Sequence, residues 1–182
     1  MVVGAFAGGA TLITLYGGTD YTLAAGAITL PYHSPIKAPF GFSTNPIKWS
    51  VEVTDNASRS QAAPAQNTWY NVGAITISIP IGCWRIYHKS TGQLADATSG
   101  GWGIQITLSN ANNSESDNEF TVQFFQNATT QINMTLTSEK FLLLAAKTSY
   151  YLNIRTTQAN LDNIYIRGDL CKTIIRAVCA YL

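Results

Sequence analysis

Apolar and polar residues alternate along most of the chain after residue 45. In Ile75–Ile79, isoleucine occupies every second position and Thr or Ser stands between. A period of two gives an extended strand one apolar face and one polar face. This pattern predicts about nine short strands, at Trp49–Val53, Ile75–Ile79, Trp84–His88, Ile104–Leu108, Phe120–Phe124, Ile132–Leu136, Tyr150–Ile154, Ile164–Ile166 and Thr173–Tyr181.

Short polar segments separate the predicted strands. Residues 90–93 (STGQ), 110–118 (NANNSESDN), 126–131 (QNATTQ) and 157–163 (TQANLDN) are rich in the residues that favour turns. Helical periodicity is nearly absent, and we interpret Phe141–Lys147 as a strand or a short turn. Many short strands without helices predict an all-β, antiparallel sandwich or barrel.

Residues 1–45 have a different composition from the rest. They are rich in glycine and apolar residues, and Asp20 and Lys37 are their only charges. A disordered tail would be more polar, and the prolines from Pro31 onwards exclude a central strand. We therefore predict an extended attachment arm over residues 1–45, followed by a β-sandwich over residues 46–182. The arm should be covered by partner subunits or by another protein.

The last predicted strand, Thr173–Tyr181, is apolar on both faces. Ile174 and Val178 point to one side, and Ile175 and Tyr181 to the other. A strand of this kind lies centrally in a sheet and is covered on both sides. At this position in the chain, we expect the second cover to be a subunit interface. Arg176 would pair there with a carboxylate, or extend its charge to the rim.

The charge of the chain is low and balanced. Only 12% of the residues are charged and the formal net charge is +1, so no basic excess is present to bind nucleic acid. Two windows, Gln61–Trp84 and Phe120–Ser138, contain no charge at all. Their Thr, Asn and Gln residues suit a subunit interface or a weakly hydrated binding surface. The alternative is an exposed, Thr-rich sheet.

The segment Asn67–Gln93 resembles the central hairpin of a known family of jelly rolls. An aromatic residue and a Val/Ile strand precede a Pro/Gly turn, and Gly82, Trp84 and Ile86 follow with the family's spacing, with Tyr87 offset by one. The segment is similar to jelly rolls of the complement-globular-head and tumour-necrosis-factor type, which also occur in bacteriophage virion proteins. The resemblance implies an antiparallel jelly-roll sandwich that forms a homotrimer.

The resemblance leaves two functions open. One is a non-enzymatic tail-fibre tip or receptor-binding domain that recognises a host surface polysaccharide. The other is a capsid decoration protein that stabilises the head through residues 1–45. Both imply a virion component that is assembled in the host cytoplasm and contacts other virion proteins through residues 1–45. The trimer interface would include Ile174, Arg176, Val178 and Tyr181.

Three aromatic residues are candidates for stacking against a sugar ring: Trp102, Tyr150 and Tyr165. Trp102 is the one we expect to be exposed, because the glycines at 100, 101 and 103 leave a bare backbone around it. The neighbouring loop Asn110–Glu119 would complete this ligand site through Asp117 and Glu119.

Catalytic and metal-binding motifs are missing from the sequence. The histidines, His33 and His88, lie in no nucleophile, zinc or phosphate-binding motif, so we expect neither enzyme activity nor a cofactor. The loop Asn110–Glu119 is interpreted as a solvated turn, and calcium binding through Asp117 and Glu119 is the functional alternative.

The cysteines Cys83, Cys171 and Cys179 have no metal-site spacing. We interpret them as buried thiols, with a disulfide from Cys83 to one of the others as the alternative. No apolar run is long enough to cross a membrane. The basic start of a secretory signal is missing, so we expect no export by that route.

Overall fold

The computed structural model describes residues 49–97, 100–128 and 130–180, and in these it contains ten strands and one 3₁₀ turn, Asn118–Phe120. The predicted arm, residues 1–45, lies outside the described residues. The strands are β1 (Ser50–Asp55), β2 (Ser58–Ala62), β3 (Thr76–Ile79), β4 (Gly82–Ala95), β5 (Gly100–Ser109), β6 (Val122–Ala128), β7 (Gln131–Leu144), β8 (Thr148–Thr156), β9 (Asn163–Arg167) and β10 (Thr173–Cys179).

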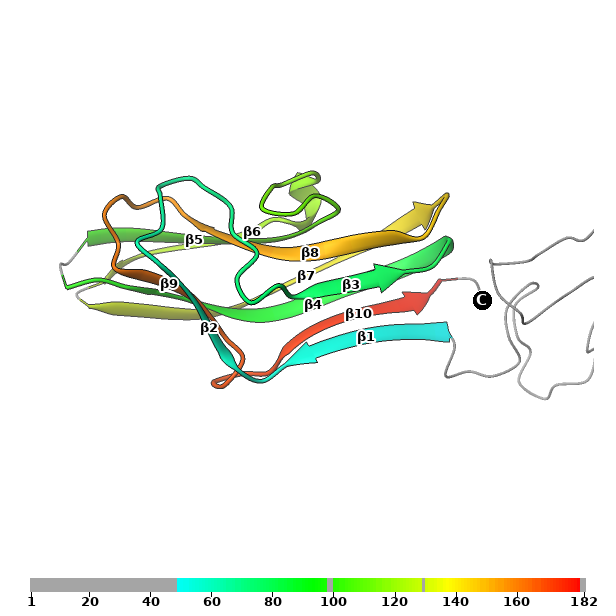
Figure 1. Cartoon of the computed structure of the whole chain (residues 1–182), viewed down its shortest axis with the longest axis horizontal. Helices are drawn as coiled ribbons and strands as arrows, with labels where there is room; N and C mark the ends of the chain where they lie inside the picture. The colour runs from blue at the N-terminus through cyan, green and yellow to red at the C-terminus, as the bar shows by residue number, and fades with distance from the viewer. Residues whose placement is uncertain (1–48, 98–99, 129, 181–182) are drawn as a thin grey trace, which may run out of the picture.

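The long strand β4 organises the first sheet (Figure 1). β7 pairs with it along its full length. On the other edge of β4, β10 pairs with residues 84–89 and β9 with residues 92–95. β1 lies beside β10, and β2 lies beside β9. The pairs β1/β2 and β9/β10 are therefore two broken strands that run side by side, and the sheet has four rows.

The strand order identifies the fold as a jelly roll. When each broken strand is counted once, the ten strands become eight, and the first sheet has the order 1-8-3-6 along the chain. The second sheet, β3-β8-β5-β6, then has the order 2-7-4-5. All pairings are antiparallel. Two four-stranded sheets with this connectivity form the double Greek key of a jelly-roll sandwich, as the sequence predicts.

The two broken strands are bent at the same place. Between β1 and β2, the Asp55 carboxylate accepts hydrogen bonds from the Ala57 N–H (3.0 Å) and from Arg59 Nε (2.9 Å). Between β9 and β10, the Gly168 N–H donates to the Ala57 carbonyl oxygen (3.0 Å). A Cβ at Gly168 would lie 2.5 Å from the Asp55 carbonyl oxygen, so the close approach of the two bends requires glycine.

The core lies between the inner faces of the two sheets. Because side chains alternate along a strand, every second residue of β4, β5 and β8 points inward. Trp84 and Ile86 on β4 and Ile104 and Ile106 on β5 all belong to this core, and all four are at most 2% exposed. Gly92 brings the sheets closest together, since a Cβ there would lie 2.8 Å from the Ile104 side chain.

Three features differ from the sequence prediction. The strand β2 was not predicted, because Ser58–Ala62 is polar and pairs only along an exposed edge. Residues 90–93 do not form a turn, since they continue β4 to Ala95 and pair with β7. Phe141–Leu144 belongs to β7, and only the residues after it turn. β10 is central in its sheet, between β4 and β1, as predicted.

Candidate interaction surface

The outer face of the first sheet carries a shallow groove of about 380 Å³. Its floor is the outward side of β10, because Thr173, Ile175 and Ala177 point into the core and the residues between them point away from it. The groove is lined by Arg85, Tyr87, Glu139, Ile174, Arg176 and Val178. Three of the four predicted interface residues therefore lie together in this groove, and the fourth, Tyr181, lies outside the described residues.

The charges that line the groove are paired. Arg176 Nε on β10 bonds to Glu52 on β1, which is the carboxylate partnership that the sequence left open. Arg85 on β4 lies near Glu139 on β7, with 3.9 Å between Nε and Oε2. Exposed ion pairs of this kind contribute little to stability. They balance the charges that line the groove, while Lys89 on β4, opposite Ile174, adds a positive charge to the same face.

Hydroxyl groups continue the same face beyond the groove. Thr91 on β4 and Thr135 on β7 stand opposite each other, and their hydroxyl oxygens are 2.7 Å apart. Thr91 is buried, whereas Thr135 and Thr137 on β7 are exposed. A face whose groove carries only paired charges resembles the surface of protein interfaces, where charged residues are depleted.

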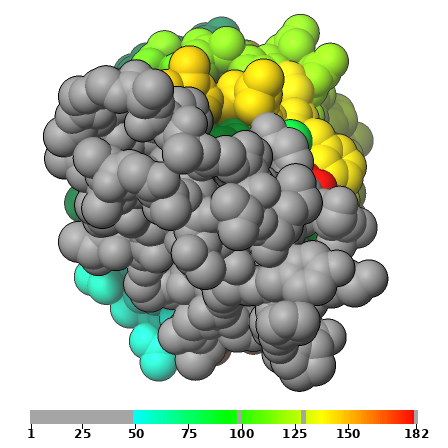
Figure 2. All heavy atoms as spheres, turned by 90° about the vertical axis from the view of Figure 1, so that its right-hand side faces the viewer, coloured from blue at the N-terminus to red at the C-terminus, as the bar shows by residue number. Residues whose placement is uncertain are grey.

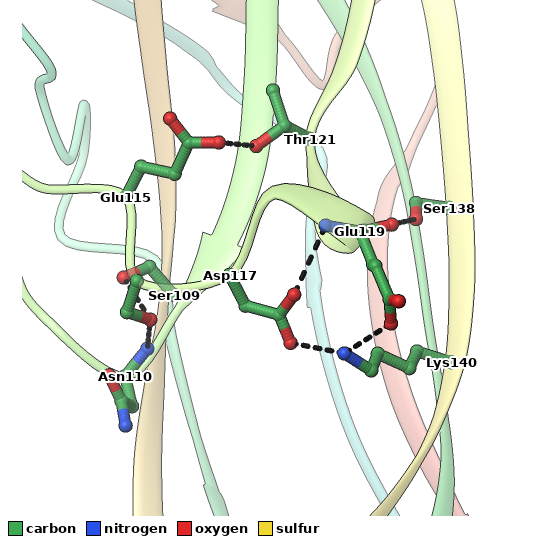
Figure 3. A network of polar contacts seen from close by, with 9 residues as sticks. Ser109, Asn110, Glu115, Asp117, Glu119, Thr121, Ser138 and Lys140 are labelled. Carbon is green, nitrogen blue, oxygen red and sulfur yellow. Dashed lines mark hydrogen bonds and ion pairs between the residues drawn. The ribbon is translucent and has the colours of Figure 1, made fainter.

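The Asp117 and Glu119 carboxylates both bind Lys140 from β7 (Figure 3). Lys140 Nζ lies 2.5 Å from Asp117 Oδ2 and 2.5 Å from Glu119 Oε2. Asp117 also accepts a hydrogen bond from the Glu119 N–H (3.1 Å) and so caps the 3₁₀ turn. The hydrogen bond that Lys140 donates lowers the pKa of Asp117, and the hydrogen bonds that Asp117 and Glu119 accept from Lys140 raise the pKa of Lys140.

This geometry argues against the calcium alternative. The lysine ammonium already occupies the space between the two carboxylates, where the cation would have to bind. Within the described residues, no group of three or more His, Cys, Asp or Glu side chains could hold a metal ion. Asp117 and Glu119 instead attach the loop before β6 to strand β7.

The predicted exposure of Trp102 is wrong. Its side chain is 1% exposed and points into the core, because Trp102 has the same parity along β5 as Ile104 and Ile106. Tyr150 is also buried, at 7% exposed, and contacts Phe120 edge to face. Neither ring can stack against a sugar without unfolding. Trp102 and Tyr150 are therefore core residues and not ligand contacts.

Tyr165 is half-buried on the outer face of the first sheet. It stands between Gln93 on β4 and Ser60 on β2. Tyr165 therefore lies on the same face of the sheet as the groove, but on β9 and not on β10. Of the three predicted aromatic contacts, it alone reaches the surface.

An exposed aromatic residue that the sequence analysis missed is Phe125 on β6. Phe125 is 59% exposed and stands directly opposite Gly103 on β5. A Cβ at Gly101 would lie 2.9 Å from its ring, so the ring lies against the glycine backbone on the outer side of the sheet. The glycines around Trp102 therefore make room for Phe125. In the sequence, Gly101 and Gly103 at every second position of a predicted strand were the signal that an aromatic ring of a neighbouring strand could lie on this face.

His88 is fully buried in β4, between Ser138 and Ile175. Its Nε2 is 3.5 Å from the Phe120 carbonyl oxygen and its Nδ1 has no hydrogen-bond partner. Burial lowers the pKa of His88 to about 4, so the ring is neutral at pH 7. His33 lies outside the described residues. The three cysteines are half-buried, and not fully buried as predicted, and they form no disulfide.

Comparison with known proteins gave no match to a family model and no match among curated proteins. Among solved structures, the chain is similar to the T13 particle of IBDV (13% identity, TM-score 0.38) and to infectious bursal disease virus Gt strain (12%, 0.38). These alignments cover 70% and 89% of this chain. The chain spans only 34% and 44% of the length of those two proteins.

A third similar structure is the virus-like particle of Macrobrachium rosenbergii extra small virus, at 9% identity and a TM-score of 0.29. That alignment covers 82% of this chain and 95% of the other. TM-scores this low do not establish a common fold, and the jelly-roll assignment rests on strand order and register. In the described residues, no helix is long and apolar enough to cross a membrane.

Proposed function

We propose that the protein is a non-enzymatic structural component of a virus particle and that it assembles through the outer face of its first sheet. The observation that carries this proposal is the groove on β10, whose floor is apolar and whose charges are already paired. Such a face loses little hydration when a second protein covers it. Fold alone would not support the assignment, because one fold serves many functions.

Jelly rolls occur in capsid proteins, in lectins and in cupins. A cupin-like activity is disfavoured, since the described residues hold no cluster of metal ligands. A lectin role loses its main candidates, since Trp102 and Tyr150 are buried. A subunit of an assembly needs neither a metal site nor a sugar-binding site. It needs a face that fits the neighbouring copies.

The assembly we propose is a homotrimer. Ile174 and Val178 would lie near the three-fold axis, where the same residues of the three copies meet, with Arg176 between them and paired with Glu52. Around a three-fold axis the same residues of the three copies come together, so the pairing of Arg176 with Glu52 and of Arg85 with Glu139 limits repulsion between like charges. Among virion components, a capsid decoration protein fits this description better than a receptor-binding tip, because it needs contact surfaces and no ligand pocket.

A charge placed in the groove tests the proposal. Val178→Glu should convert the assembled protein to monomers in sedimentation velocity, because it buries an unpaired carboxylate at the interface. The control is Ser78→Glu, which adds the same charge to an exposed position on β3 of the second sheet. Unchanged assembly by Val178→Glu, or equal loss by both variants, would overturn the proposal.

A receptor-binding tip that recognises glycan is the second candidate, and the exposed ring of Phe125 favours it. An aromatic face can stack against the C–H face of a pyranose, and the carboxamide of Asn127 lies beside Gly101 on the same surface. Phe125→Ala should then abolish binding of the protein to purified cell-surface polysaccharide. Binding that survives this substitution would exclude Phe125 as the contact.

A further inference from the structure

Exposed apolar side chains gather at one end of the sandwich. Ile81 is 37% exposed, Phe141 is 63% exposed and Leu143 is 76% exposed. Phe141 and Leu143 are outward-facing residues at the end of β7, and Ile81 lies in the turn between β3 and β4. These three residues are called the apolar end below. None of them lines the groove on β10.

The apolar end lies where the described chain begins. Figure 1 shows the β3–β4 turn and the end of β7 at the same end of the molecule as the start of β1. Figure 2 faces this end, with atoms of the β7–β8 region in yellow and the start of β1 in cyan. The described chain therefore begins at the same end of the sandwich as a patch of exposed hydrophobic side chains. A patch of this kind marks a docking site.

The chain has enough length to reach this patch. β1 is separated from β7 by β10 and β4. Three strand spacings of about 4.8 Å make roughly 14 Å, which about five extended residues span. Residues 1–45 provide far more chain than this distance requires. A neighbouring copy is therefore not needed to supply them.

The composition of residues 1–45 also matches the patch. Their only charges are Asp20 and Lys37, and leucines and isoleucines such as Leu12, Ile13 and Leu15 recur among Ala, Gly and Thr. Such a segment in water would leave apolar surface exposed, as the apolar end does. Contact between the two removes both surfaces from water.

We infer that residues 1–45 dock on the apolar end of their own chain, over Ile81, Phe141 and Leu143. The segment is then part of the subunit, and not an arm reserved for other virion proteins. The apolar end adjoins the groove on β10, since Phe141 stands opposite Arg85, which lines the groove. The tests of docking therefore use Leu143, which is not among the residues that line the groove.

A photo-crosslinker in the full-length protein tests the contact. Benzoylphenylalanine in place of Leu143 should crosslink to peptides from residues 1–45. The matched control carries the same probe in place of Phe125, an exposed position on the second sheet, and should lose this product. Isotopically light and heavy chains are mixed before irradiation, so that mass spectrometry separates contacts within a chain from contacts between copies. Crosslinks between copies, crosslinks to residues 49–180 only, or no product would overturn the inference.

Proteolysis gives an independent readout in the same full-length protein. Lys37 is the only basic residue in residues 1–45, so trypsin cuts this segment at a single site. Leu143→Asp should accelerate this cut several-fold, because a charge on the apolar end releases the segment. Phe125→Asp, the matched control, should leave the rate unchanged. Equal rates in wild type and Leu143→Asp would contradict the inference. Val178→Glu tests assembly separately, so failure of one proposal is distinguishable from failure of the other.

Discussion

Phe125 lies directly opposite Gly103, on the side of the second sheet that points away from the core. The missing side chain at Gly103 gives space to Phe125 and to Thr157, whose hydroxyl oxygen would lie 2.3 Å from a Cβ at this position. Trp102 lies between Gly101 and Gly103 in the sequence. Its side chain points to the other side of the second sheet, into the core, and is buried. On β5, Trp102 therefore belongs to the core, and its neighbour Gly103 belongs to the outer surface of the second sheet.

Trp102 and Phe125 should respond differently to truncation. Trp102→Ala should lower the free energy of unfolding by about 3–5 kcal/mol, because it leaves a cavity in the core. Phe125→Ala should change it by about 0.5 kcal/mol or less, because more than half of the ring is already in water. Urea denaturation followed by tryptophan fluorescence or circular dichroism measures both values. Similar losses in the two variants would contradict the assignment of faces on β5 and β6.

The junction of the two broken strands should tolerate no side chain at Gly168. Gly168→Ala places a methyl group against two backbone carbonyl oxygens, which cannot rotate away. We expect a loss of about 1–3 kcal/mol in the free energy of unfolding. Gly100→Ala is the control, since its nearest neighbour would be the Trp102 side chain at 3.1 Å. An equal or larger loss in the control would show that the junction is not especially tight.

His88 should make the fold sensitive to mild acid. Its pKa is about 4 in the folded protein and about 6.5 when unfolded, so protons bind preferentially to the unfolded chain. The neutral, buried His88 contributes fully to the free energy of unfolding above pH 6.5. This contribution falls as the pH decreases towards 4, by about 3 kcal/mol in total. Asp55 and Asp117 have lowered pKa values, so their contributions are lost only below about pH 4.

The variant His88→Leu separates this effect from other titrations. Between pH 7 and pH 4.5, the free energy of unfolding of wild type should fall more steeply than that of His88→Leu. Denaturant titrations at half-unit pH steps measure the difference. Parallel curves for the two proteins would show that His88 is accessible to protons in the folded state.

In the wild-type protein, no external cation should displace Lys140 from its place between Asp117 and Glu119. Millimolar calcium should leave the melting temperature unchanged, because Lys140 already neutralises Asp117 and Glu119. Lys140→Met should lower the melting temperature, because it leaves two carboxylates facing each other. Differential scanning calorimetry with calcium and with chelator checks both statements. A calcium-dependent rise in wild type would restore the metal site.

The sandwich could be predicted because alternation is a local property. Ile75, Ile77 and Ile79 show their buried side without any knowledge of the partner strand. The core positions of Trp84 and Ile86 follow from the same rule. β2 escaped prediction because Ser58–Ala62 gains its structure from pairing with β9 and carries no apolar face of its own.

The functional site was less predictable because it depends on contacts between distant residues. Ile174, Arg176 and Val178 could be placed on one face because one strand contains all three. Lys140 and Asp117 are 23 positions apart, and only the sheet brings the ammonium between the carboxylates. Trp102 was misplaced because flanking glycines indicate close packing on one side of a strand as well as exposure. The parity of Trp102 with Ile104 and Ile106 was the better guide.

The most direct test of assembly through the first sheet is a crystal structure of the full-length protein at the concentration where it associates. The account predicts three copies around a common axis, with the outward side of β10 buried between them and Val178 inaccessible to solvent. A structure in which the outer face of the first sheet stays in water, while copies contact one another elsewhere or not at all, would contradict it.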